Sequence, residues 1–158
     1  MSKSKEVSIN SREKIVGLEK DLISIADGVS IEGTGKEIMT NSKIAPVEHI
    51  FADNIYVRRM DIKKGNAVVG AIHKHLHVWF LLTGRITVAT EDSTEDYIAP
   101  CYTVSTPGVK RVILANEDSI FVNIHKNPSN TQDISELEKE IVALNYKEYE
   151  EYVNNKNK

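Results

Sequence analysis

The feature that most constrains the fold of this chain is a run of short, strand-like segments that fills the middle of the sequence. Gly, Pro, Asn and Asp residues punctuate the run at intervals of about 8–12 residues. The predicted strands cover residues 49–51, 55–62, 67–73, 77–83, 85–90, 97–98, 102–105, 109–114 and 119–125. Many short strands at this spacing are typical of antiparallel sandwiches and barrels. We therefore expect a mainly β protein whose central domain covers residues 45–126.

The segment before the barrel, residues 1–44, contains one predicted helix. After Ser11, a suitable N-cap residue, apolar side chains recur at helical spacing at Ile15, Leu18, Leu22 and Ala26. This pattern predicts an amphipathic helix over residues 11–26.

The segment after the barrel, residues 127–158, predicts a second amphipathic helix. Ser135 and Glu138 form a capping-box pattern at its start. An apolar stripe follows at helical spacing, formed by Ile134, Leu137, Ile141 and Leu144. Such a stripe needs a partner surface, so we expect it to cover the barrel of its own chain or of a second chain.

Three of the five histidines stand at alternate positions, His73, His75 and His77. Alternate residues of an extended strand share one face, so these imidazoles can converge on one ion if the backbone bends. Neutral imidazole is the commonest protein ligand for transition metals. We therefore predict a site for one divalent ion, such as zinc, iron, manganese, nickel or copper. The alternative is a histidine cluster at the barrel mouth that binds no metal.

Charge and composition exclude several classes of function. The formal net charge is -3 and the sequence pI is about 6.0, which disfavours binding to nucleic acid or to an anionic membrane. No apolar stretch approaches the ~20 residues that span a bilayer. The single cysteine, Cys101, cannot form an intramolecular disulfide, and residues 1–6 lack the apolar part of a signal peptide. We expect a soluble protein of the cytoplasm.

The central region resembles the cupins, small antiparallel barrels of the jelly-roll type. The first cupin motif contains a His-x-His pair, which His73 and His75 match, and a closing glycine, which Gly84 matches. His77 stands where the family has its glutamate. Gly108 matches a glycine of the second cupin motif.

Arg111 stands where the second cupin motif has its final metal-binding histidine. The resemblance implies that the Arg111 guanidinium faces the same cavity as the histidines, where it can bind a carboxylate or a phosphate. The alternative is an exposed arginine on the rim. His125, near the end of the last strand, is either a further ligand or a solvent-facing side chain. Cupins are commonly dimers, so the resemblance also implies a homo-oligomer.

The sequence of the region is similar to that of short cupin-like proteins encoded by bacteriophages. The shared parts are a histidine-rich strand, the segment Pro107–Arg111, the turn Glu117–Asp118, a strand ending at His125 and an acidic C-terminal helix. This resemblance implies a viral origin, with the protein in the host cytoplasm or in the virion.

Two functions fit these observations. The first is a non-catalytic module that binds a metal or sequesters a small anionic ligand, or that is a part of the virion. The second is a metal-dependent isomerase, lyase or hydrolase acting on a small anionic substrate. We favour the first, because no residue of the sequence stands out as a general acid or base.

Overall fold

The structure is a computed structural model that describes residues 3–24 and 46–157. Its elements are α1 (Lys3–Ser24), β1 (Val47–Ala52), β2 (Ile55–Ile62), β3 (Ala67–Val69), β4 (Ile72–His73), β5 (His77–Thr83), β6 (Arg85–Ala89), β7 (Thr94–Ile98), β8 (Cys101–Ser105), β9 (Val112–Ala115), β10 (Ser119–Lys126), α3 (Ile134–Ile141), β11 (Val142–Ala143) and α4 (Tyr146–Lys156). The predicted run of short strands is confirmed. The predicted strand 67–73 is interrupted after Val69 and resumes as β4.

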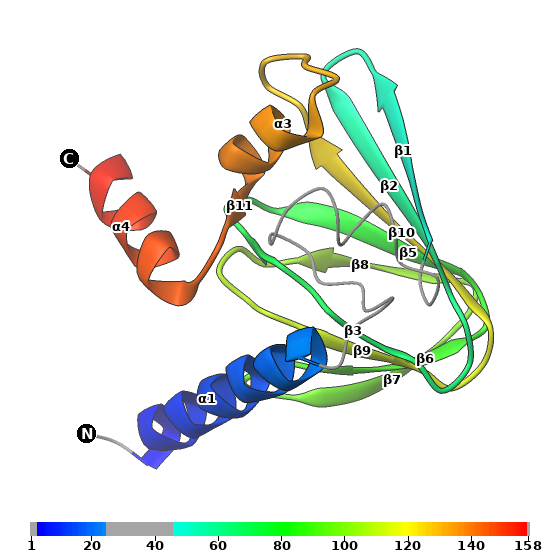
Figure 1. Cartoon of the computed structure of the whole chain (residues 1–158), viewed down its shortest axis with the longest axis vertical. Coiled ribbons are helices and arrows are strands. Elements are labelled where there is room, and N and C mark those ends of the chain that lie inside the picture. The colour runs from blue at the N-terminus through cyan, green and yellow to red at the C-terminus, as the bar shows by residue number, and fades with distance from the viewer. Residues whose placement is uncertain (1–2, 25–45, 158) are drawn as a thin grey trace.

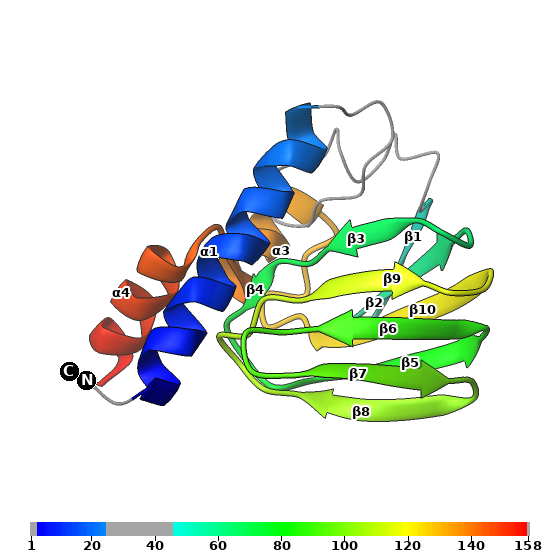
Figure 2. The same cartoon turned by 90° about the horizontal axis from the view of Figure 1, so that it is seen from below.

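The strands form two main antiparallel sheets that enclose a barrel (Figures 1 and 2). The order is β1-β2-β10-β5-β8 in the five-stranded sheet and β3-β9-β6-β7 in the four-stranded sheet, while β4 pairs with β11. Because β10 lies between β2 and β5, and β9 between β3 and β6, the chain crosses repeatedly from one sheet to the other, as jelly rolls do. The predicted mainly β architecture with a helix at each end is confirmed.

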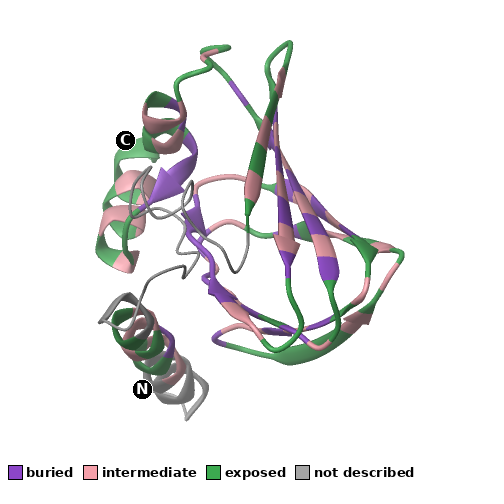
Figure 3. Cartoon of the chain, turned by 45° about the vertical axis from the view of Figure 1, so that its right-hand side comes forward, coloured by how far each residue is buried: buried purple, intermediate pink, exposed green. Residues whose placement is uncertain are grey.

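The core lies between the inner faces of the two sheets. Buried and less buried residues alternate along β2, β5 and β10, as Figure 3 shows, because successive side chains of a strand point to opposite faces. Trp79 packs at the centre of the core, with ring-centroid distances of 5.0 Å to Phe121 and 4.9 Å to Tyr97. The buried core residues are Met60, Ile62, Val68, Trp79, Leu81, Ile86, Val88, Ile113, Ala115 and Phe121.

Gly84 makes the turn between β5 and β6. Its φ of +83° lies in the left-handed region, and a Cβ at this position would collide with the carbonyl of Asp118 and with Ser119. Only glycine fits this turn without strain. The match of Gly84 to the closing glycine of the cupin motif therefore has a steric reason.

Helix α1 begins at Lys3, earlier than the predicted start at Ser11, and the predicted end at Ala26 lies outside the described residues. Ile15 is buried, and ion pairs join the helix to two barrel loops, Arg12 to Glu91 and Glu19 to Lys110. Among the helices of the described residues, none is long and apolar enough to cross a membrane.

The start of helix α3 differs from the predicted capping box. Asp133 is the N-cap, and its carboxylate accepts hydrogen bonds from the backbone amides of Ser135 and Glu136, at 2.8 and 3.3 Å. Ser135 therefore lies inside the helix. An aspartate at the N-cap uses the same physics as the predicted serine, because both offer a side-chain oxygen to unpaired amides.

The apolar stripe of the C-terminal segment covers the barrel of its own chain. Leu137 and Ile141 of α3 are buried and pack with Tyr56 and Ala71. Leu144 falls after α3 and is exposed. The C-terminal segment thus covers one end of the barrel.

Candidate functional site

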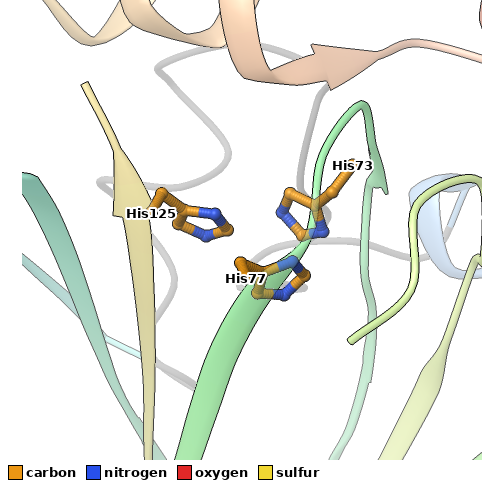
Figure 4. A group of neighbouring side chains, drawn as sticks. All are labelled: His73, His77 and His125. Carbon is orange, nitrogen blue, oxygen red and sulfur yellow. The ribbon is translucent and has the colours of Figure 1, made fainter. Parts of the chain in front are cut away.

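Three histidine side chains meet at one end of the barrel lumen (Figure 4). His73 ends β4, His77 starts β5, and His125 lies near the end of β10. One nitrogen of each ring lies within 4.8 Å of the others, and the ring centroids are 4.2 to 4.6 Å apart. Three nitrogens bound to one ion at ~2.1 Å lie about 3.4 Å from one another. Small side-chain rotations are therefore enough to close these rings on a metal.

The segment with alternate histidines is not a single strand. The backbone bends at Lys74 and His75, so His73 and His77 face each other across the bend. The His75 ring sits further away, with its centroid 6.3 Å from that of His77 and 5.6 Å from that of His125. The structure thus brings His125 together with His73 and His77 and places His75 beside this trio.

Backbone hydrogen bonds from distant segments hold the bend in place. The amide of Lys74 donates to the carbonyl of Ile141 at 2.8 Å, and the amide of Gly108 donates to the carbonyl of His73 at 3.0 Å. Val142 of β11 pairs with His73 in the register of the two-stranded sheet. The position of His73 therefore depends on the C-terminal segment.

The register of the five-stranded sheet places His125. Ile124 pairs with Val78, so the next residue, His125, lies beside His77. On its other side His125 pairs with Tyr56 of β2, and the two rings stack with centroids 5.9 Å apart. The Tyr56 hydroxyl is 2.7 Å from Nδ1 of His49, a residue to which the sequence assigned no role. All five histidines of the chain thus gather at this end of the barrel.

Burial keeps the cluster uncharged. Desolvation lowers the pKa of His77 to about 3 and that of His75 to about 4. The same cause lowers the pKa values of His73 and His125 well below the ordinary 6.5. Metal ions bind the neutral form of imidazole, so the rings are in the ligating state at neutral pH.

The charged side chains that also lower these pKa values are cations. In the part of the chain that the structure describes, they are Arg58, Arg111 and Lys126, and no carboxylate acts on the four histidines. The formal charges that act on the four histidine rings are therefore positive. An anion would lower the energy of this charge distribution, and a bound metal ion would strengthen the attraction.

Sequence reasoning missed Arg58. This residue of β2 is 3% exposed, lies opposite Asn123 in the register with β10, and places Nη1 3.8 Å from Sδ of Met60. Its side chain therefore lies inside the barrel near His125. The alternation of Arg58 with Tyr56 and Met60 is visible in the sequence, but it does not tell which face of the strand is inward.

Arg111 lies directly before β9, close to the histidine trio. It lines a cavity of about 240 Å³ together with Trp79, Tyr97 and Thr103. Its charge also lowers the pKa values of His73 and His77, so the guanidinium acts on both the cavity and the cluster.

Several buried polar atoms at this end have no hydrogen-bond partner among the residues that the structure describes. They include Nδ1 of His77 and of His125, and Oγ of Ser105, which pairs with His77 across the sheet. Buried polar atoms are nearly always satisfied in folded proteins, and unsatisfied ones are often found where a ligand or an ion binds. The residues present therefore fit a divalent metal with a small polar guest.

No protein-family model and no curated protein matches this chain. Solved structures do match it. KdgF from Halomonas sp. aligns at 11% identity over 54% of this chain and 82% of that chain, with a TM-score of 0.48. A cupin 2 domain-containing protein from Halorhodospira halophila aligns at 20% identity over 61% of this chain and 70% of that chain, with a TM-score of 0.48.

A variant of oxalate decarboxylase from B. subtilis aligns at 15% identity, with a TM-score of 0.50. The match covers 58% of this chain and 28% of the decarboxylase, so this chain corresponds to less than a third of that enzyme. Together with the sheet order, the likeness to the decarboxylase confirms the predicted antiparallel jelly-roll barrel. At these identities the likeness concerns the fold alone.

Proposed function

We propose that this protein binds one divalent transition metal ion on His73, His77 and His125 and holds a small anionic ligand beside it. The observation that carries the proposal is the meeting of three buried, neutral imidazoles within 4.8 Å of one another. Zinc, iron, manganese and nickel all accept such nitrogen ligands, and three protein ligands leave coordination positions open. His75 is close enough to approach as a fourth ligand after a change of rotamer.

The charge of the site supports an anionic ligand. Neutral imidazoles leave the full double charge on a bound ion, and Arg58 and Arg111 add two cationic groups nearby. A carboxylate or phosphate would balance these charges, and a guanidinium can bind either through two parallel hydrogen bonds. Metal and anion should therefore bind more tightly together than apart.

The proposed role is binding without catalysis. Among the described residues, no carboxylate is among the groups that shift the pKa values of the three histidines, so the cluster lacks a carboxylate that could serve as general acid or base beside a bound ion. The alternative, a metal-dependent isomerase, lyase or hydrolase acting on a small anion, would be favoured by turnover of such a compound. A viral origin and a place in the virion stay predictions that rest on the sequence resemblance.

Calorimetric titration of the untagged protein, stripped with a chelator, tests the metal site. We expect close to one zinc or nickel ion per chain for the wild type. His77→Ala should weaken the affinity by about 100-fold, because it removes a ligand that the other two cannot replace. His49→Ala is the matched control, since this histidine lies at the same end but outside the trio, and it should leave the stoichiometry unchanged.

The same titration shows whether His75 and the arginines take part. A weaker affinity in His75→Ala would make His75 a fourth ligand. Added phosphate or malonate should tighten metal binding by about tenfold in the wild type and less in Arg111→Gln. A wild type that binds no metal, or a His77→Ala variant that binds as tightly as the wild type, contradicts the proposal.

A further inference from the structure

Lys74 stands between His73 and His75 in the bend that shapes the site, yet its side chain contacts another part of the molecule. In Figure 2, β4 lies on the side of the barrel where α3 and α4 gather. The ammonium group of Lys74 donates a hydrogen bond of 2.8 Å to the carbonyl of Lys139, in the last turn of α3. Only 10% of the Lys74 side chain is exposed, so this long cationic side chain is held against the C-terminal segment.

Lys74 closes the carboxyl end of α3 with two donors. Besides the ammonium group, its backbone amide donates to the carbonyl of Ile141, the last residue of the helix, at 2.8 Å. The final carbonyls of a helix have no partner within the helix and carry a partial negative charge, so a cation with N–H donors suits this position. A lysine often fills it from the last turn of its own helix. Here the lysine comes instead from the bend between two histidines of the cluster.

The same side chain reaches α4. Nζ of Lys74 lies 3.5 Å from Oε1 of Glu148 and 5.5 Å from the centroid of the Tyr152 ring. The other carboxylate oxygen of Glu148 accepts a hydrogen bond of 3.0 Å from the amide of Leu144, just before the N-cap of α4. One ammonium group therefore connects both C-terminal helices to the bend.

A second contact joins α4 to the same bend. A Cβ at Gly108 would lie 2.5 Å from the ring of Tyr149, so this ring sits directly on the glycine. The amide of Gly108 donates to the carbonyl of His73 at 3.0 Å. The backbone of His73 is thus held through Gly108 on one side and through Lys74 on the other.

We propose that Lys74 is a positioning residue of the metal site, which fixes the bend against α3 and α4 so that His73 meets His77 and His125. This inference rests on the proposed metal site. The ammonium group contacts the two helices and acts on a bound ion only through the backbone of His73. Residues that orient the ligands of a metal from outside typically change its affinity by about 10- to 100-fold.

Calorimetric titration of the chelator-stripped, untagged protein with Zn²⁺ tests this role. Lys74→Met keeps the aliphatic stem of the side chain and removes the ammonium group, so it should weaken the Zn²⁺ affinity by about tenfold. Lys74→Arg retains a cationic donor and should recover most of the lost affinity. Lys63→Met is the matched control and should bind Zn²⁺ like the wild type. Lys63 forms an exposed ion pair of 2.8 Å with Asp118, directly after the end of β2 that lies away from the histidines.

The visible absorption of bound Co²⁺ is a readout that a change of stability alone would not move. Its bands depend on the number and the geometry of the ligands. A displaced His73 in Lys74→Met should shift these bands or change their intensity. Lys74→Arg and Lys63→Met should reproduce the wild-type spectrum.

Circular dichroism shows whether Lys74→Met keeps the fold. If it does not, Glu148→Gln replaces it in the test, because this variant removes the charge that pairs with Lys74 and keeps an oxygen for the amide of Leu144. Glu148→Gln should weaken the Zn²⁺ affinity by about threefold.

The outcomes separate this role from the metal site itself. A wild-type affinity and Co²⁺ spectrum in folded Lys74→Met, or in Glu148→Gln where Lys74→Met does not fold, overturn the role of Lys74 and leave the metal site standing. An equal loss of affinity in Lys63→Met would trace the effect to net charge and also overturn the role of Lys74. A wild type that binds no Zn²⁺ overturns the metal site and this role together.

Discussion

The two ends of the barrel lumen are built by the same strands and bury different chemistry. On β5, Trp79 and Leu81 belong to the apolar core, whereas His77 at the start of the strand faces the other histidines. On β10, Phe121 packs against Trp79, whereas His125 joins the histidine trio. The pleat of the strand sets the direction of each side chain, and the residue types at the inward positions change from apolar core to histidine cluster.

This difference has an energetic side. Burial of Trp79 and its neighbours stabilises the fold at about 25 cal/mol for each Å² of apolar surface removed from water. At the histidine end, Nδ1 of His77 and Oγ of Ser105 are buried without a hydrogen-bond partner in residues 3–24 and 46–157. Each such atom costs about 1–3 kcal/mol. One end of the lumen therefore stabilises the fold, and the unsatisfied polar atoms at the other end lower its stability.

Truncation of a side chain at each end should show the contrast most strongly. Trp79→Ala should lower the free energy of unfolding by about 3–5 kcal/mol, because it opens a cavity in the core. Ser105→Ala, at the histidine end, should change it by less than about 1 kcal/mol or raise it, because it removes an unsatisfied hydroxyl. Urea denaturation of the metal-free proteins measures both values. Equal losses from the two variants would remove the distinction between the ends.

Acid should destabilise the protein through the histidine end. The pKa of His77 is about 3 in the folded protein and 6.5 in an unfolded chain. Between these values the unfolded state binds more protons, so the free energy of unfolding falls as the pH falls. Below pH 6.5, protonation of this one group in the unfolded chain lowers the free energy of unfolding by about 1.4 kcal/mol per pH unit, or by about 2 kcal/mol at pH 5. Above pH 6.5 this loss disappears.

The variant His77→Gln should therefore lose less stability between pH 7 and pH 5 than the wild type. Chemical denaturation of metal-free protein at several pH values measures the slope. Trp79→Ala serves as the control, because it should lower stability by a similar amount at every pH. A wild type and a His77→Gln variant with identical slopes would mean that His77 is not buried in its neutral form.

A smaller effect is expected in the segment that covers the histidine end. Asp133→Ala removes the N-cap of α3 and should lower the free energy of unfolding by about 1 kcal/mol. Ser135→Ala should have almost no effect, although the sequence pattern predicted the cap at this serine. Thermal denaturation compares the two variants. A larger loss of stability for Ser135→Ala than for Asp133→Ala would mean that the capping box predicted at Ser135 is correct.

Sequence reasoning succeeded where the structure depends on local signals. Short strands, punctuating turn residues and the glycine at position 84 are all encoded within a few residues, and the fold followed from them. His73 and His77 were found by their spacing. The selection of His125 over His75 depends on the bend at Lys74 and on the register of β10 with β5, which join distant parts of the chain.

The inward position of Arg58 was beyond the reach of the sequence for the same reason. Both faces of β2 contain charged residues, and only its pairing with β10 shows that Arg58 lies inside and Arg59 outside. The N-cap at Asp133 was missed because Ser135 offered an equally good pattern two residues later. The structure differs from the sequence-based prediction mainly in the contacts across the barrel, and less in the strands themselves.

The pairing of β4 with β11 sets an order of events during protein synthesis. His73 emerges from the ribosome well before Val142, the residue that pairs with it. Until the last strand of the chain has been translated, the segment around His73 lacks its partner and the trio cannot assemble. If the trio binds an ion as proposed, a nascent chain would therefore be unable to capture it in this arrangement before translation has passed β11.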